Sequence, residues 1–194
     1  RVHELHEGKH SLWMTDLPEE LNQIEEMLHN VKPQGQVLVG GLGLGIVAKR
    51  LTEIPGIKNV TVIEHSKEVI KLCADGAYET ICSDIMEYLT SDRLHQHPFD
   101  FYLLDTWGGT NEATWWGTVL PLRRTIRNRW GSKPVIHCWS EDIQLGQVMR
   151  CLLGPNRVWV YKNLPLMNKR EAHYFVKNIG LPKWEDMYSK LLPI

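Results

Sequence analysis

The most informative segment of the sequence for the fold is Val37-Leu38-Val39-Gly40-Gly41-Leu42-Gly43-Leu44-Gly45. It begins with a short apolar run typical of a buried strand and continues into a glycine-rich segment. Ile46, Val47 and Leu51 then follow at the spacing of a helix with one buried face. Glycines at such a junction let the backbone turn tightly and approach a ligand with no Cβ in the way. The stretch therefore predicts a strand, a glycine loop and a helix, in that order. We expect the loop to bind a ligand; a glycine-rich turn that binds nothing is the alternative.

Apolar runs of strand length recur after this loop and alternate with helical patterns. The predicted strands are Val60–Ile63, Thr80–Cys82, Phe99–Leu104 and Val135–Cys138. Of the helices between them, the first is capped by Ser66 and carries Val69, Ile70 and Leu72, the next is Asp84–Leu89, and the last carries Trp115, Trp116, Val119 and Leu122. Such alternation is typical of βαβ units. The strands are near-continuous apolar runs, as expected when helices cover both faces. We therefore predict an α/β fold with a Rossmann-like, doubly wound, mostly parallel sheet.

The length of 194 residues suits a single domain. We expect residues 36–140 to form a cofactor-binding core and residues 1–35 an N-terminal extension. That extension includes a helix from Leu17 to about Asn30, with Asp16 as its cap and Glu19 completing a capping box. Near the C-terminus, residues 158–161 and 174–176 are expected to pair as an antiparallel edge hairpin.

Composition and charge exclude several classes of protein. Lys and Arg number 22 against 23 Asp and Glu, so the formal net charge is −1 and gives no global attraction to nucleic acid or an anionic membrane. The longest apolar stretches are strand-sized, and residues 1–13 lack the apolar centre of a secretory signal. Cys73, Cys82, Cys138 and Cys151 form no CxxC pair and lie in apolar segments. We therefore expect free buried thiols and a cytoplasmic protein.

Acidic residues stand where predicted strands end. Glu64 follows the glycine loop by about 20 residues, the place where a carboxylate accepts hydrogen bonds from ribose hydroxyls; a solvated charge is the alternative. Asp84, between Ser83 and Ile85, either caps the next helix or accepts from the adenine amine while Ile85 packs on the ring, and both roles are compatible. Asp105 is placed to orient an amine or hydroxyl nucleophile or to take its proton.

Aromatic residues and a histidine lie close to these strand ends. Trp107, Trp115 and Trp116 either wall a pocket and attract a cation or are structural, and we expect at least one of Trp115 and Trp116 to be structural. His137 ends the fifth strand, where it either assists proton transfer or is a hydrogen-bonded core histidine.

Two charged clusters carry weaker functional interpretations. They are Arg123, Arg124, Arg127 and Arg129 beside Trp130, and His3, His6 and His10 with Glu4. The first suits phosphate or RNA, although the solvated face of a helix is favoured. The second suggests a metal ion, but we favour a frayed terminus and predict no metal site.

Four motifs, taken in order, resemble those of class I S-adenosylmethionine-dependent methyltransferases. They are Val37–Gly45, Val62-Ile63-Glu64, Ser83-Asp84 and Asp100–Asp105. Within that superfamily the sequence is similar to the spermidine-synthase-like branch in two places: Glu64-His65-Ser66 and the following apolar helix with Val69, Ile70 and Leu72. The resemblance covers residues 36–140.

This resemblance implies S-adenosylmethionine as the cofactor. It implies that Gly41, Gly43 and Gly45 approach the methionine part, that Glu64 holds the ribose and that Asp84 with Ile85 faces the adenine. Gly40, His65, Ser83 and Asp105 complete the predicted cofactor-binding set, and the predicted catalytic set is Asp105, Trp107 and His137.

The chain departs from the family at identifiable positions. Thr106, Trp107 and Gly108 follow Asp105, where aminopropyltransferases carry a second Asp, and the residues before the first motif are too few for their N-terminal β-domain. The segment Asp105–Gly108 also lacks the Asn-Pro-Pro-Tyr-type signature of enzymes that methylate amino groups of nucleic acids.

We therefore predict an S-adenosylmethionine-binding enzyme that transfers a methyl group to a small-molecule acceptor. The alternatives are an aminopropyltransferase-like polyamine enzyme, an NAD-dependent oxidoreductase, and an inactive cofactor-binding or assembly protein. For NAD the third glycine comes one residue early, since Ile46 stands where G-x-G-x-x-G needs it. No membrane or nucleic-acid partner is expected, and the eight tryptophans leave a homo-oligomer open.

Overall fold

A computed structural model describes residues 2–8, 11–91, 99–107, 114–131, 133–141, 143, 144 and 147. The chain divides into two compact units. One comprises Arg1–Gly108 with Thr125–Trp139, and the other Gly109–Arg124 with Ser140–Ile194. The sheet and the four sequence motifs lie in the first unit. The hairpin predicted at residues 158–161 and 174–176 lies outside the described residues.

Five parallel strands form the sheet, in the order β5-β4-β3-β6-β7. They are β3 (Gly35–Gly40), β4 (Ile57–Glu64), β5 (Glu79–Cys82), β6 (Phe101–Leu104) and β7 (Val135–Cys138). From β3 the chain proceeds outward to β4 and β5, then returns to the other side of β3 as β6. The strand order therefore reverses at β3, which is the switch point where open α/β sheets bind ligands. All five predicted strands are confirmed.

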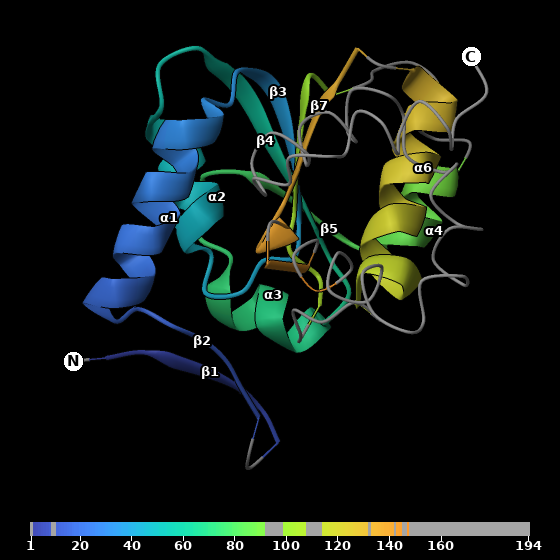
Figure 1. Cartoon of the computed structure of the whole chain (residues 1–194). Helices are drawn as coiled ribbons and strands as arrows, with labels where there is room; N and C mark the ends of the chain where they lie inside the picture. The colour runs from blue at the N-terminus through green and yellow to red at the C-terminus, as the bar shows by residue number, and fades with distance from the viewer. Residues whose placement is uncertain are drawn as a thin grey trace. The chain divides into compact units, whose positions relative to one another are not determined.

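Helices α1 (Pro18–Val31) and α2 (Ile46–Glu53) cover one face of this sheet (Figure 1). Successive side chains of a strand point to opposite faces, so alternate strand residues meet these helices. The buried cluster on this face includes Val37, Val39, Val60, Val62, Phe101 and Leu103 from strands, and Ile24, Leu28, Ala48 and Leu51 from helices. Burying each large aliphatic or aromatic side chain contributes about 1.5–3 kcal/mol, so this cluster is a main source of stability.

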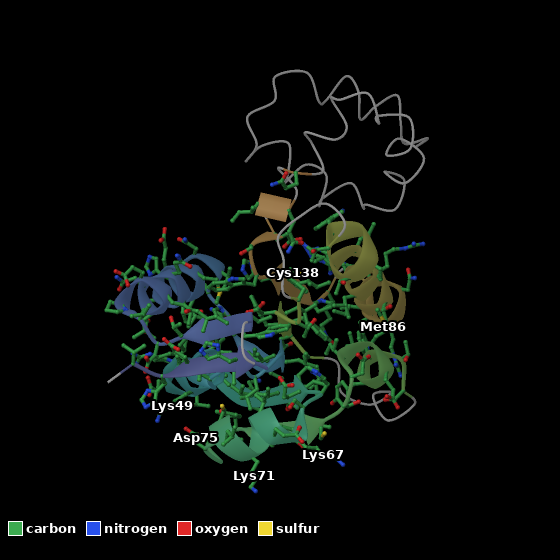
Figure 2. All side chains as sticks on the ribbon, turned by 90° about the horizontal axis from the view of Figure 1, so that it is seen from below. Lys49, Lys67, Lys71, Asp75, Met86 and Cys138 are labelled. Atoms are coloured by element: carbon green, nitrogen blue, oxygen red, sulfur yellow. The ribbon has the colours of Figure 1, made fainter. Side chains whose placement is uncertain are left out.

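The opposite face is covered by α4 (Ile85–Thr90) and by the last turns of α6 (Leu120–Trp130) (Figure 1). Tyr102 of β6 is fully buried and stacks on Trp130, with ring centroids 5.7 Å apart. Met86 of α4, labelled in Figure 2, accepts a hydrogen bond from the Thr125 hydroxyl (3.4 Å). Helices on both faces of a parallel sheet confirm the predicted α/β, doubly wound class.

The predicted helix around Trp115 begins with a wider turn than expected. Trp115–Val119 form a π-helical segment, η2, which continues into α6. Trp115 is 1% exposed, which confirms that one of the two adjacent tryptophans is structural. The side chain of Trp116 lies outside the described part of the chain.

The N-terminus is a hairpin, and the expectation of a frayed end is wrong. Strands β1 (Glu4–Glu7) and β2 (Ser11–Thr15) pair antiparallel. The hairpin is closed by His3, whose backbone N–H donates to Asp16 Oδ1 (2.7 Å) and whose Nδ1 lies 2.6 Å from Asp16 Oδ2. These bonds hold the pKa of Asp16 below its usual value. Within the described ranges, no group of three His, Cys, Asp or Glu side chains is placed to hold a metal ion.

Because Asp16 is engaged with His3, the predicted capping box of Asp16 and Glu19 does not form. The N-cap of α1 is Leu17, with no side-chain cap, and Pro18 is the first residue of the helix. The Glu20 carboxylate reaches back instead, and accepts from the Thr15 N–H (2.8 Å) and the Thr15 hydroxyl (2.6 Å). Glu20 thereby fastens the hairpin to α1.

Helix α3 (Lys67–Cys73) begins after Ser66, and none of its side chains is fully buried. The Ser66 hydroxyl caps it by accepting from the Val69 N–H (3.3 Å). Leu72 is 77% exposed, and Figure 2 shows Lys67 and Lys71 of the same helix on the surface. The helix is short and follows β4 toward the edge strand β5, so it covers little of the sheet.

The described cysteines are free, but they are not all buried. Cys138 is buried, Cys73 is half-buried and Cys82 is exposed. The prediction for Cys82 was wrong because β5 is an edge strand, whose side chains have no neighbouring strand on one side. Cys151 lies outside the described residues. No helix in the described ranges is long and apolar enough to cross a membrane.

Candidate functional site

The parallel register brings the ends of neighbouring strands to one edge of the sheet. Gly40 at the end of β3 pairs with Ile63 of β4 and with Leu104 of β6, so these three strands end nearly level. The glycine loop and the acidic residues that end or follow the strands therefore emerge along this edge: Glu64, Asp84 and Asp105. Carboxyl ends of parallel strands are where this class of sheet binds ligands.

The loop from Gly41 to Gly45 requires glycine for two reasons. Its backbone is left-handed, with φ of 92° at Gly41 and 54° at Gly43, a conformation that other residues adopt at a cost. A Cβ at Gly41 would collide with the Asp105 carbonyl oxygen, and one at Gly43 would lie 2.6 Å from the Met14 sulfur. The glycines thus let Asp105 and Met14 approach the loop closely.

The amide N–H groups of this loop differ in how they are satisfied. That of Leu42 donates to Glu64 Oε2 (2.9 Å), and that of Leu44 to the Met14 thioether sulfur (3.3 Å). Within the described residues nothing accepts from the N–H of Gly43. A thioether is a weak acceptor. The loop therefore presents one open donor and, next to it, one that is weakly held.

Glu64 is buried at the end of β4, with 6% exposure, so the interpretation of a solvated charge is wrong. Its Oε2 accepts from Leu42, while Oε1 accepts from the Ser66 N–H (2.8 Å) and lies 3.0 Å from His65 Nδ1. The carboxylate therefore ties the glycine loop to the turn after β4. Its two oxygens provide about four acceptor positions, so the protein donors do not exhaust them. The ribose role of Glu64 stays a prediction.

Asp84 is the N-cap of α4, which confirms its predicted structural role. Its Oδ1 accepts from the N–H groups of Met86 (2.8 Å) and Glu87 (2.9 Å). Both bonds fall on one oxygen, and no donor from the described residues reaches Oδ2. The adjacent Ser83 donates its N–H to the Glu64 carbonyl (3.0 Å), which couples the two strand ends. Ile85 is 8% exposed, so only its edge is accessible to an adenine ring.

Asp105 follows β6 and is bound to the loop through its backbone, since its N–H donates to the Gly40 carbonyl (2.8 Å). Its side chain keeps an exposed surface. Desolvation by the surrounding protein is the main cause that raises the pKa of Asp105 to about 7, and repulsion from the Glu20 carboxylate is the second. Water at the exposed surface moderates this shift without reversing its direction. Asp105 is therefore a carboxyl group able to exchange a proton near neutral pH.

Trp107 carries a buried indole Nε1 with no acceptor among the described residues. A buried N–H without an acceptor costs about 1–3 kcal/mol, so an acceptor on a bound molecule would stabilise it. His137 is half-buried in β7, where it pairs in register with Leu103. Its role in proton transfer stays a prediction.

The arginine cluster is engaged with protein acceptors. Arg123 forms a buried ion pair with Glu141 (2.7 Å) in the second unit. In the first unit, Arg127 donates to the Pro134 carbonyl (2.7 Å) and Arg129 to the Ser91 carbonyl (2.7 Å). Three of the four arginines thus hold structure together, which argues against a phosphate or RNA site. For the buried Arg123, the interpretation of a solvated helix face is also wrong.

Two residues of the site escaped the sequence analysis: Met14, which contacts the glycine loop, and Glu20, which acts on Asp105. Both belong to the N-terminal hairpin and its attachment to α1. The available signal was Gly8, which separates the apolar residue Leu5 from the apolar segment Leu12–Met14. A glycine between two such runs is typical of a hairpin turn.

No protein-family model and no curated protein matches this chain. Similar solved structures include a SAM-dependent methyltransferase from Archaeoglobus fulgidus, with 18% identity over 59% of this chain and 48% of that chain, TM-score 0.42. Precorrin 8w decarboxylase from Methanobacterium thermoautotrophicum has 16% identity over 63% of each chain, TM-score 0.46. The plantazolicin methyltransferase BpumL, in complex with a pentazolic desmethylPZN analog and SAH, has 14% identity over 81% of this chain and 62% of that chain, TM-score 0.43. The present chain spans about half the length of the Archaeoglobus protein.

Proposed function

We propose that this chain binds S-adenosylmethionine and transfers its methyl group to a small-molecule acceptor. The observation that carries the proposal is the pairing of one open and one weakly held loop donor with a buried carboxylate at adjacent strand ends. The N–H groups of Gly43 and Leu44 suit an anionic carboxylate, whereas the Glu64 oxygens suit hydroxyl donors such as those of ribose. An adenosyl amino acid carries both kinds of group on one molecule.

The remaining residues fit the same ligand. Asp84 has one oxygen left for the exocyclic amine of adenine, and Ser83 and His65 flank Glu64. The buried Nε1 of Trp107 lacks an acceptor that a bound molecule would provide.

Bound S-adenosylmethionine would supply a methyl group on a sulfonium. The leaving group is then the neutral thioether S-adenosylhomocysteine, which needs no proton to depart. The chain's own task is therefore to align the acceptor and manage its proton. Asp105 orients the acceptor nucleophile and takes its proton, because a carboxyl with a pKa near 7 is substantially ionised at neutral pH and is a stronger base than an ordinary aspartate. Trp107 excludes water beside it, and His137 is the second candidate for proton transfer.

The acceptor we favour is an amine. Glu20 places a second negative charge close enough to Asp105 to raise its pKa, so the local potential favours a cation. Hydroxyl and carboxylate acceptors lack this attraction. The same charge pair is compatible with aminopropyl transfer, which the product distinguishes from methyl transfer.

Calorimetric titration with S-adenosylhomocysteine and with NADH tests the cofactor. We expect S-adenosylhomocysteine to bind and NADH to give no heat. Glu64→Gln exchanges a carboxylate oxygen for an amide donor and should weaken S-adenosylhomocysteine binding about tenfold or more, the effect of losing one charged hydrogen bond. Glu53→Gln, at an exposed carboxylate of α2, is the matched control. NADH binding in place of S-adenosylhomocysteine would overturn the proposal.

Turnover is measured as release of S-adenosylhomocysteine with panels of amine, hydroxyl and carboxylate acceptors. Asp105→Ala should lower turnover while leaving S-adenosylhomocysteine affinity within about threefold of the parent, since less than about 0.7 kcal/mol of binding depends on it. Release of methylthioadenosine would identify aminopropyl transfer. Binding without any product across the panels would favour the inactive binding protein.

A further inference from the structure

Met14 of the N-terminal hairpin reaches the glycine loop. Its sulfur accepts from the Leu44 N–H at 3.3 Å and would lie 2.6 Å from a Cβ at Gly43. The side chain is half-buried and packs against the core cluster that lies between the sheet and helices α1 and α2. The hydrogen bond to Leu44 and the closeness of the same sulfur to Gly43 place a thioether on the loop segment that carries the open Gly43 donor.

The attachment of the hairpin fixes where Met14 sits. The next residue, Thr15, is held through both its N–H and its hydroxyl by Glu20 (2.8 and 2.6 Å). Asp16 is held by His3. The backbone at residue 14 is therefore anchored, but the unbranched Met side chain has several rotatable bonds. Met14 can leave Leu44 by a rotamer change while the hairpin stays in place.

We propose that Met14 is a specificity-determining residue that caps the Leu44 N–H until the carboxylate of the ligand displaces it. This inference rests on the proposed function. A thioether is a weak acceptor, whereas a hydrogen bond from N–H to a carboxylate is about twice as strong as one between neutral groups. A ligand with an amino-acid end therefore displaces the sulfur. A ligand that carries only the adenosine and thioether parts leaves it in place.

Two variants move this competition in opposite directions. Met14→Leu keeps most of the volume and removes the acceptor, so the ligand no longer has to displace it. Met14→Gln keeps a similar length and supplies an amide oxygen, a stronger acceptor that competes better with the ligand. Met27→Leu, at another partly buried methionine packed on the same core, is the matched control.

The experiment is calorimetric titration of each variant with S-adenosylhomocysteine and with 5′-methylthioadenosine, which lacks the amino and carboxylate groups. Affinity for S-adenosylhomocysteine should rise about two- to fivefold in Met14→Leu and fall by a similar factor in Met14→Gln, the range for a weak hydrogen bond. Affinity for 5′-methylthioadenosine should stay unchanged throughout. Hydrogen exchange of the Leu44 amide, without ligand, should be faster in Met14→Leu than in the parent.

The outcomes separate this inference from the proposed function. If the parent binds S-adenosylhomocysteine but Met14→Leu and Met14→Gln bind it equally well, the role of Met14 is overturned while the cofactor stands. Equal changes for both ligands would also overturn it, because they would show a general effect on the site. If the parent binds neither ligand, the proposed function fails, and the ligand named here fails with it. Circular dichroism shows whether each variant folds. If one of Met14→Leu and Met14→Gln does not fold, the other, for which the opposite change in affinity is expected, decides the question.

Discussion

Replacing Glu64 by Ala should destabilise the protein even without a ligand. The carboxylate is 6% exposed and accepts from the N–H groups of Leu42 and Ser66 at 2.9 and 2.8 Å. Alanine provides no acceptor for either group. The two donors belong to different segments, the glycine loop and the turn after β4, so their connection through the side chain is lost as well.

The magnitude follows from those two bonds. A buried N–H left without an acceptor costs about 1–3 kcal/mol, which gives about 2–6 kcal/mol for the pair. Ser66 is only half-buried, so water replaces part of its lost bond. We therefore expect the free energy of unfolding to fall by about 3 kcal/mol. For a chain of this size that lowers the melting temperature by about 6–12 °C.

Urea unfolding followed by circular dichroism measures this change, with Glu53→Ala as the exposed control. The midpoint should fall for Glu64→Ala at an unchanged slope, and stay within error for Glu53→Ala. An unfolding midpoint for Glu64→Ala equal to that of the parent would show that the carboxylate does not hold the loop. Binding losses in this variant are interpretable only after its stability is known, which is why Glu64→Gln serves for the cofactor test.

Other positions give equally direct expectations. Asp84→Ala removes the cap of α4 and should cost about 1 kcal/mol by urea unfolding; no change would show that the cap is dispensable. Gly41→Ala must adopt φ 92° and meets the Asp105 carbonyl, so its melting temperature should fall by several degrees, against none if the loop relaxes freely. Asp105 binds its proton more tightly when folded, so the parent should lose stability relative to Asp105→Asn as pH rises from about 4 to about 7. A stability difference between these two proteins that stays constant with pH would contradict the raised pKa.

The strands and the loop are predictable because they follow from local chemistry. Apolar runs such as residues 37–39 and 60–63 have the length of a strand. In a βαβ pattern, the glycines or acidic residues that follow such a run mark the end of the strand. Asp84 and Ser66 cap helices as expected because a cap involves only neighbouring residues. Asp16 does not cap α1, because its carboxylate is hydrogen-bonded to His3, which lies 13 residues earlier in the chain.

The order of strands, glycines and carboxylates is a property of the sequence, and it determines the α/β class and the end of the sheet where we propose that a ligand binds. Only the tertiary structure brings the Met14 sulfur to the loop, binds Glu20 to the hairpin and buries Glu64. The physical reason is range. Hydrogen-bonding capacity and apolar periodicity are local properties, whereas the partner that satisfies each group is chosen by the packing of segments far apart along the chain.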